Sequence, residues 1–329
     1  MGIIHLTLPT RFNAKKEKLP FFLAMEEFAA RELTEYPELF FMWQVPPTVI
    51  FGRNQDILNE VDLKFCSNNN IEFYRRKSGG GCVYADEGNI MLSYITTSDE
   101  VTTTFSAYTS RIAAVLRSLG LNAEATGRND ILVDGKKVSG NAFYHIPHRS
   151  IVHGTMLFST NLDNMLGALT PSSDKLQSKG IKSVRSRITT LDSRLSLGIE
   201  EFKAYVLDQL CDKEHQLTYD DIRDIHEIES TYKSQSFRFG RTPFAKVTRK
   251  EHFDGVGEVD AAFDIVDDVI CHFSLSGDFF PIGDIDTLVS ALENVVYDAS
   301  DITDALDGID VSKVIMNLSN EQFINLIIS

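Results

Sequence analysis

The segment at residues 75–84, which reads RRKSGGGCVY, joins three consecutive glycines to two arginines and a lysine. Glycine lacks a Cβ, so such a loop can turn successive backbone N–H groups toward a bound phosphate or carboxylate. An ordinary tight turn uses the same residue types, and the motif alone leaves both interpretations open. The chemistry that this segment could support is the binding of an anion.

Two other segments carry side chains that could act on such an anion. Residues 135–142, GKKVSGNA, place Lys137 among small residues on the arm of an expected hairpin. From there its ammonium could reach a phosphate or a developing oxyanion, although hairpin lysines often only face solvent. Residues 153–155, HGT, place His153 in an apolar strand, either as a ligand contact or as a hydrogen-bonded core residue.

The composition disfavours several classes of protein. A chain of 329 residues that is 43% hydrophobic can bury one or two sizeable cores without disulfides. Its net charge of −15 argues against a general nucleic-acid or anionic-membrane surface. The four cysteines form no CxxC pair and the apolar start is too short for a membrane span, so we expect a cytoplasmic protein. Basic residues gather at 175–194, which suggests a small anionic ligand.

The elements expected around these segments indicate an α+β fold. A strand at 71–74 leads into the glycine segment, and hairpins are expected at 131–138 and 138–159. Further strands are expected at 39–43, 48–51 and 90–96, and helices at 21–33, 62–66, 104–119, 199–210 and 219–233. We therefore expect a mixed or antiparallel sheet backed by helices.

Two domains are expected. A larger domain would cover residues 1–244 and a small α+β domain would cover 245–329, with a linker at 237–244 that contains GRTP. The second domain is expected to hold strands at 246–253, 256–265 and 269–275 and helices at 285–293, 300–306 and 320–327. Residues 171–190 have no periodicity and are typical of a surface loop.

Taken together, the order and spacing of the motifs resemble the lipoate-protein ligase A family, within the biotin and lipoate ligase superfamily. The matching motifs are GRNQ at 52–55, RRKSGGGCVY at 75–84, DEGN at 86–89, GRNDI at 127–131, GKKVSGNA at 135–142, HGT at 153–155 and KGIKSVRSRIT at 179–189. The C-terminal region also resembles the accessory domain of the bacterial ligase, so the resemblance spans nearly the whole chain.

The resemblance implies a two-step reaction. ATP and free lipoate would give lipoyl-AMP and pyrophosphate, and the lipoyl group would then pass to a lysine of a lipoyl carrier domain. The implied carriers are the acyltransferase subunits of 2-oxoacid dehydrogenases and the glycine-cleavage H protein. ATP and Mg²⁺ are the implied cofactors, and we expect a monomer without nucleic-acid or membrane partners.

The resemblance also implies roles for individual residues. Lys137 would be the catalytic residue, in contact with the acyl carbonyl and the phosphate in both steps. ATP or adenylate binding is implied for Arg76, Gly81, Cys82, Val83, Tyr84, Asn89, Asn129, Asp130, Lys137 and Lys182, with Asp130 a candidate Mg²⁺ ligand. Lipoate binding is implied for Trp43, Ser78, Gly79, Gly80, Lys137 and His153. The basic loop at 175–187 is expected to close over the intermediate.

Two residues beside the glycine segment depart from the family pattern. The family usually has a His-Asp pair where this chain has Ala85 and Asp86, and Cys82 stands where alanine is commoner. A cysteine leaves open an ATP-independent octanoyl or lipoyl transferase, although the nucleophile of those enzymes lies near the strand corresponding to residues 147–155. A catalytically degenerate lipoate-binding paralogue is the other alternative.

Overall fold

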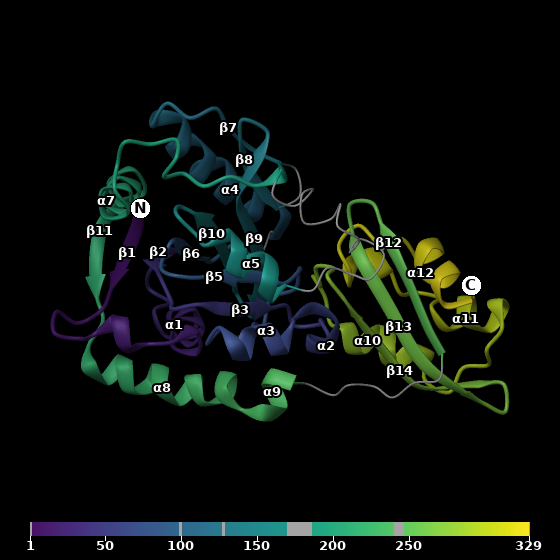
Figure 1. Ribbon diagram of the computed structural model, residues 1–329. Helices are drawn as coiled ribbons and strands as arrows, with labels where there is room; N and C mark the ends of the chain where they lie inside the picture. Colours follow the sequence, from purple (N-terminus) through teal and green to yellow (C-terminus); the bar gives the residue numbers. More distant parts are fainter. Residues whose placement is uncertain (1, 99–100, 127–128, 170–185, 240–246, 329) are drawn as a thin grey trace.

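The computed structural model describes residues 2–98, 101–126, 129–169, 186–239 and 247–328, and its elements are labelled in Figure 1. The helices are α1 (Leu19–Glu32), α2 (Ile57–Glu60), α3 (Leu63–Asn68), α4 (Val101–Ser118), α5 (Leu162–Ala168), α7 (Ile199–Leu210), α8 (Tyr219–Lys233), α9 (Gln235–Phe239), α10 (Ile285–Leu292), α11 (Ala299–Ala305) and α12 (Asn320–Ile328). The strands are β1 (Ile3–Thr7), β2 (Glu38–Trp43), β3 (Thr48–Phe51), β4 (Glu72–Arg75), β5 (Val83–Ala85), β6 (Asn89–Thr96), β7 (Ala123–Ala125), β8 (Asp130–Val133), β9 (Lys136–Ile146), β10 (Arg149–Leu157), β11 (Cys211–Gln216), β12 (Val247–Phe253), β13 (Gly257–Val266) and β14 (Val269–Gly277). None of the described helices is both long and apolar enough to span a membrane.

An eight-stranded mixed sheet, in the order β11-β1-β2-β6-β10-β9-β8-β7, lies at the centre of the larger part of the molecule. The strands from β2 through β6, β10 and β9 to β8 pair antiparallel, whereas β1 pairs parallel with β2 and β11. A short turn joins β9 to β10, so residues distant in sequence face one another across these two strands. The mixed sheet with its helices confirms the expected α+β fold.

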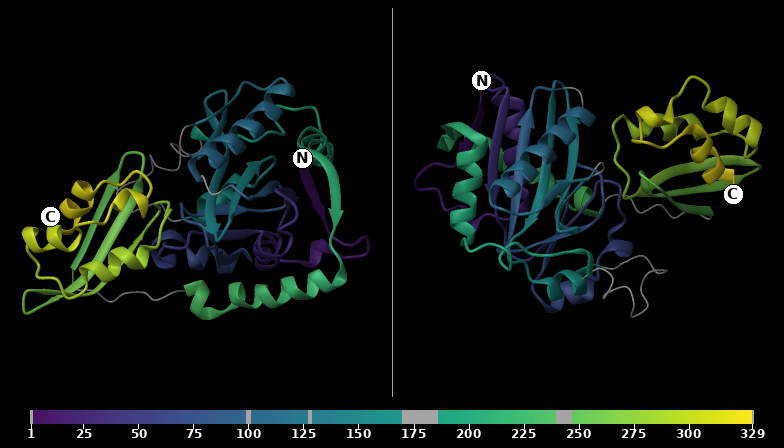
Figure 2. Two further views of the ribbon diagram at one scale, coloured as in Figure 1. Left: turned by 180° about the vertical axis from the view of Figure 1, so that it is seen from behind. Right: turned by 90° about the horizontal axis from the view of Figure 1, so that it is seen from above.

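Helices cover both faces of this sheet, as Figure 2 shows from two further directions. α1 and α8 bury one face, where Phe22 and Ile225 belong to the same apolar cluster. α4 and α7 bury the other face through side chains such as Phe105 and Phe202. Each fully buried side chain of this kind stabilises the fold by about 1.5–3 kcal/mol. The two layers hold the sheet rigid between them.

A second sheet, in the order β4-β3-β5, carries the glycine segment. β3 pairs parallel with β4 and antiparallel with β5, so residues 76–82 connect the two outer strands. Gly80 has a φ of 84°, a left-handed conformation that favours glycine. Arg75 holds the adjacent turn, because its Nη1 donates to three carbonyls in residues 52–55 at 2.7–3.2 Å. Arg75, at the start of the glycine segment, therefore ties that segment to the GRNQ turn.

The C-terminal part has a core of its own and contacts the glycine segment. β12, β13 and β14 form an antiparallel sheet that packs with α10, α11 and α12. The backbone N–H of Gly80 donates to the carbonyl of Phe279 at 3.1 Å, and the Phe280 ring stacks on Phe143 of β9 with centroids 5.6 Å apart. The expected domain boundary between residues 244 and 245 lies outside the described residues, so the division into domains stays a prediction.

Most expected elements have counterparts in the structure, and the differences have physical reasons. α7 and α8 have the expected bounds, 199–210 and 219–233. Strand β1 and the edge strand β11 were not expected, and the polar sequence CDKEHQ of β11 shows no strand alternation. β11 owes its conformation to parallel pairing with β1. Residues 237–239, expected in the linker, belong to α9.

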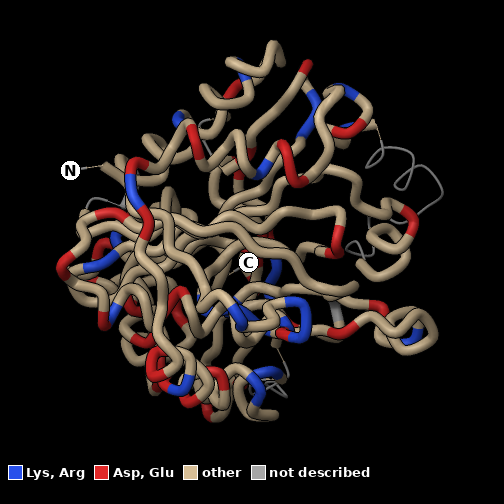
Figure 3. Tube along the Cα trace, turned by 90° about the vertical axis from the view of Figure 1, so that its left-hand side faces the viewer, with Lys and Arg blue, Asp and Glu red and all other residues tan. Residues whose placement is uncertain are grey.

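Acidic side chains meet where the C-terminal part approaches α2. Burial, followed by the charges of Glu258 and Asp278, raises the pKa of Glu60 to about 7. Burial also raises the pKa of Asp260 to about 6. Lys250 offsets part of this repulsion through ion pairs with Glu258 and Asp260. Figure 3 shows acidic and basic residues interspersed along the chain, so this cluster is a local feature.

We predict that Glu60→Gln stabilises the protein at pH 8 and changes its stability little at pH 5. The folded state holds the Glu60 proton more tightly than the unfolded chain, whose pKa is 4.5, so Glu60 costs stability as the pH rises from about 4.5 through about 7. Thermal unfolding of both proteins at the two pH values measures the effect. The exposed Glu251→Gln is the control, and an equal stabilisation at both pH values would contradict the prediction.

A second prediction concerns the contact of the C-terminal part with β9. Phe280 is 2% exposed and packs into the cluster of the larger part, so Phe280→Ala should lower the free energy of unfolding by about 3 kcal/mol. Urea denaturation of the full chain measures this. The control Val266→Ala, at a side chain 51% exposed, should change it by less than about 0.5 kcal/mol. Similar effects of the two substitutions would show that the Phe280 contact is not formed in solution.

Candidate active site

A cavity of about 110 Å³ lies between α1, the main sheet and the glycine segment. Its apolar wall comes from α1 and from several strands, through Leu23, Trp43, Ile50, Val83, Met91 and Ala142. The remaining lining residues are Arg76, Gly80, Gly81, Cys82, Asn129, Lys137, Gly140, Asn141, His153, Gly154 and Thr155. An apolar wall with a few polar groups suits a ligand that has an alkyl chain and a charged end.

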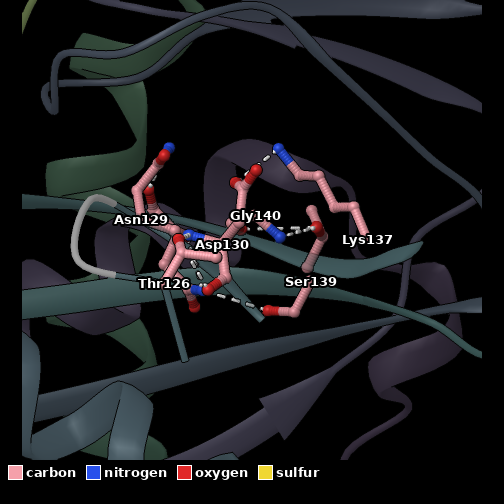
Figure 4. A network of polar contacts seen from close by, with 8 residues as sticks. Thr126, Asn129, Asp130, Lys137, Ser139 and Gly140 are labelled. Carbon is pink, nitrogen blue, oxygen red and sulfur yellow. Dashed lines mark hydrogen bonds and ion pairs between the residues drawn. The ribbon is translucent and has the colours of Figure 1, made fainter. Parts of the chain in front are cut away.

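Lys137 lines this cavity. Its side chain and that of Asp130 point toward one another (Figure 4). The Nζ of Lys137 lies 2.7 Å from Oδ1 of Asp130, and both side chains are about one third exposed, at 36% and 29%. An ion pair this open to water contributes little stability, so Lys137 can exchange its partner for a ligand anion at small cost. A Cβ on Gly140 would come within 2.9 Å of Lys137 Nζ, so the glycine leaves room for the lysine side chain.

The chain after the basic loop returns to Lys137. Residues 170–185, which include Lys182 and most of that loop, lie outside the described residues. Directly after these residues, Ile188 forms a parallel bridge with Lys137. The N–H of Thr189 donates to the Lys137 carbonyl at 3.0 Å. The C-terminal end of the KGIKSVRSRIT motif is therefore anchored on the strand of the lysine.

Arg76 holds the glycine segment in shape. Its guanidinium, buried beneath the loop, donates to Ser78 Oγ at 2.8 Å and to the carbonyls of Ile50, Gly79 and Gly81 at 3.0, 2.7 and 2.8 Å. Burial lowers the pKa of Arg76 to about 10, which still leaves it charged at neutral pH. Arg76 therefore satisfies the carbonyls of Gly79 and Gly81, while the N–H of Gly80 donates to the carbonyl of Phe279.

Trp43 and His153 stand in the cavity wall, each fixed by a hydrogen bond. The Trp43 ring stacks on Phe22 with centroids 4.9 Å apart, and its Nε1 donates to Ser93 Oγ at 2.8 Å. His153 Nε2 lies 2.7 Å from Ser78 Oγ, so the histidine contacts the glycine segment directly. Ser78 itself is fully buried behind the wall.

Several residues for which the resemblance implies ligand binding are absent from the cavity lining. Tyr84 is buried in the cluster around the β4-β3-β5 sheet. Asn89 bonds to backbone, with Nδ2 donating to the Tyr84 carbonyl at 3.0 Å and Oδ1 accepting from Met156 N at 3.1 Å. Gly79 packs against residues 279–281, because a Cβ there would lie 2.6 Å from the Phe279 carbonyl. Roles in ligand binding for these three residues stay predictions.

Cys82 lines the cavity, but its thiol is not activated. Burial, and then the charge of Glu60, raises the pKa of the Cys82 thiol far above its usual range. The thiolate is the nucleophilic form, so Cys82 is a poor nucleophile at neutral pH. Ala85, the other departure from the family pattern, is fully buried and packs in the cluster around α1.

Sequence reasoning missed part of the cavity wall. Leu23, Ile50 and Met91 belong to an ordinary apolar helix and strands, and no sequence signal separates a cavity wall from a core. Gly140 is different, because it lies inside the GKKVSGNA motif and a small residue beside a functional lysine could have been inferred. Glu26, which contacts His153, carries no signal within its helix pattern.

Two family models match the chain. The model of the lipoyl protein ligase A/B catalytic domain matches residues 19–211, and that of the bacterial lipoate protein ligase C-terminus matches residues 242–327. Among curated proteins, the lipoate-protein ligase LplJ of Bacillus subtilis is 34% identical, covering 93% of this chain and 95% of its own. Lipoate-protein ligase 1 of Staphylococcus aureus is 36% identical, and the match covers 92% of this chain and 95% of that ligase.

Solved structures show the same fold. LipL1 of P. falciparum in complex with lipoate has a TM-score of 0.80 at 20% identity, covering 99% of this chain and 98% of its own. A lipoate-protein ligase A bound with ATP has a TM-score of 0.61 at 24% identity, and the match covers 73% of this chain and 99% of that ligase. With a catalytic-domain model over more than half of its length and relatives above 30% identity along nearly all of it, the chain belongs to the lipoate-protein ligase family.

Proposed function

We propose that this protein is an ATP-dependent lipoate-protein ligase, which converts free lipoate to lipoyl-AMP and transfers the lipoyl group to a lysine of a carrier domain. The observation that carries the proposal is the placement of Lys137 beside an apolar cavity whose other edge is the glycine segment. The cavity wall offers van der Waals contact to an alkyl chain and a dithiolane ring. The ligases of B. subtilis and S. aureus support the same activity.

In the first step the lipoate carboxylate attacks the α-phosphorus of ATP. A carboxylate oxygen forms a bond to phosphorus, and the bond from phosphorus to the pyrophosphate oxygen breaks. Two anions must approach each other, so a fixed cation between them lowers the barrier. Lys137 supplies that cation when it leaves Asp130. The backbone N–H groups of Gly81 and Cys82, two residues that line the cavity, are proposed as further donors.

In the second step the ε-amine of the carrier lysine attacks the acyl carbonyl. The new amide bond forms as the bond from the acyl carbon to the phosphate oxygen breaks, AMP leaves, and the amine releases a proton to solvent. Lys137 stabilises the negative charge that develops on the acyl oxygen. Asn129 of the cavity wall is a further donor for the nucleotide.

We propose Asp130 as the residue that would hold Mg²⁺. The ion usually binds one or two carboxylates together with substrate phosphates, and Asp130 presents a carboxylate oxygen next to Lys137. When bound, Mg²⁺ would neutralise phosphate charge. Lys182 and the basic loop are proposed to cover the adenylate.

Lipoyl carrier domains are the proposed partners, and one structural neighbour is described as a bi-partite ligase with its E2 lipoyl domain. Acyltransferase subunits of 2-oxoacid dehydrogenases and the glycine-cleavage H protein both present such domains. We propose that the protein works in the cytoplasm as a monomer, without nucleic-acid or membrane partners, since its net charge of −15 would repel both surfaces.

An ATP-independent transferase is the weaker alternative. It needs a cysteine thiolate, whereas burial keeps Cys82 in its thiol form. A degenerate lipoate-binding paralogue would have no reason to keep Lys137, Asp130 and the glycine segment around one cavity. Both alternatives give distinct outcomes in the experiments below.

We predict that Lys137→Ala lowers lipoate-dependent pyrophosphate release about 100-fold or more, because it removes the cation that stabilises the transition state. The release is measured with lipoate, ATP and Mg²⁺. Lys136→Ala is the matched control, since Lys136 is an exposed neighbour on the same strand and does not line the cavity. No lipoate-dependent release by the native protein would overturn the ligase proposal, and equal activity of the two variants would remove Lys137 from the mechanism.

We predict that Cys82→Ser retains ATP-dependent lipoylation of a carrier domain within about threefold, because a protonated thiol plays no part in bond making. Carrier lipoylation is followed by mass spectrometry with lipoate and ATP, and separately with an acyl-carrier-protein donor without ATP. Transfer from that donor that disappears in the variant would instead establish the transferase.

A further inference from the structure

A buried carboxylate lies behind the cavity wall. Glu26 on α1 has no exposed surface and is absent from the cavity lining. Its carboxylate accepts two hydrogen bonds, from Ser93 Oγ at 2.5 Å and from His153 Nδ1 at 2.8 Å. An isolated buried charge is costly, so a carboxylate in this position requires the groups that surround it.

One branch runs from Glu26 to the glycine segment. His153 Nδ1 faces Glu26, its Nε2 lies 2.7 Å from Ser78 Oγ, and Ser78 Oγ lies 2.8 Å from Arg76 Nε. Arg76 in turn binds the carbonyls of Gly79 and Gly81. A buried negative charge and a buried positive charge are thus joined through one imidazole and one hydroxyl.

For a neutral His153, the donors and acceptors along this branch have a single consistent direction. Arg76 can only donate, so Ser78 Oγ accepts from Arg76 and its hydroxyl hydrogen is available to His153 Nε2. An ionised carboxylate can only accept, so His153 donates from Nδ1. The hydrogen bond at one ring nitrogen sets the tautomer, and the network therefore assigns His153 as the Nδ1–H form.

The other branch runs from Glu26 to the apolar wall. Ser93 Oγ donates to Glu26 and accepts from Trp43 Nε1 at 2.8 Å. Ser93 and His153 face one another across the paired strands β6 and β10, which places both on the side of α1. Glu26 therefore accepts from His153 directly and from Ser93, the residue that fixes Trp43.

We propose that Glu26 is a positioning residue for lipoate binding, which fixes the tautomer of His153 and, through Ser78, the glycine segment. The proposal rests on the ligase function proposed above and names a residue that does not touch the substrate. Trp43 and His153 line the cavity, so the acyl chain meets surfaces whose orientation Glu26 sets. At metal sites, residues that orient a ligating side chain change affinity by about 10-fold to 100-fold when mutated, and we expect an effect at the lower end of this range here.

The test begins with the native protein. The ring-nitrogen spectrum of ¹⁵N-histidine-labelled protein identifies the tautomer of His153, whose signal is the one lost in His153→Gln. We expect the Nδ1–H form. A native His153 that carries its proton on Nε2 would overturn the proposal without any variant of Glu26, whether or not the protein releases pyrophosphate.

Glu26→Gln provides the functional arm. The amide has one acceptor oxygen for two donors, Ser93 Oγ–H and His153 Nδ1–H, so the Nδ1–H population should fall and KM for lipoate should rise about tenfold. KM for ATP should rise less than KM for lipoate, because Glu26 contacts His153 directly and reaches the glycine segment only through His153 and Ser78.

Glu27→Gln is the matched control. Glu27 is the next residue of α1, is 3% exposed, and pairs with Lys77 at 2.6 Å and Arg31 at 2.5 Å rather than with His153. Its substitution should lower stability and leave the His153 tautomer unchanged. Equal rises of KM for lipoate in both variants, or no rise in Glu26→Gln, would show that Glu26 acts only as a structural residue.

Discussion

The active-site geometry depends on the hydrogen bonds that Arg76 makes beneath the glycine segment. A loop of three glycines has too much conformational freedom to hold a ligand unless something fixes it. Arg76 does so by binding the carbonyls of Gly79 and Gly81, while Ser78 couples it to His153. Burial of the guanidinium makes these bonds strong, because water does not compete for the same donors.

The second constraint is that the cavity joins two unlike environments. Its wall of Trp43, Met91 and Leu23 excludes water, whereas Lys137 and Asp130 keep a third of their surface in water. An apolar acyl chain would lie against the first and the reacting phosphate against the second. This separation lets one site bind an alkyl group tightly and still keep a lysine whose partner can be exchanged.

Sequence predicted the parts of this site that have unusual local composition. Residues of the glycine segment, Lys137 and the HGT strand line the cavity. They could be predicted because glycines, and isolated charges among small residues, stand out in the sequence. Glu26 and Leu23 could not be found in this way, since a helix buried on nearly all sides hides which of its residues meets which neighbour. The same reasoning explains β11, whose pairing with β1 depends on tertiary contacts rather than on its own residues.

The C-terminal part also takes part in the geometry of the site. The N–H of Gly80 donates to the Phe279 carbonyl, and the Phe280 ring fills space beside Phe143. One N–H forms one strong hydrogen bond, so Gly80 offers its donor to a ligand anion only when its bond to Phe279 opens. A ligand that binds the Gly80 N–H would therefore compete with the Phe279 carbonyl for this donor. The triple glycine thus contacts two parts of the molecule: the carbonyls of Gly79 and Gly81 accept from Arg76, and the N–H of Gly80 donates to the C-terminal part.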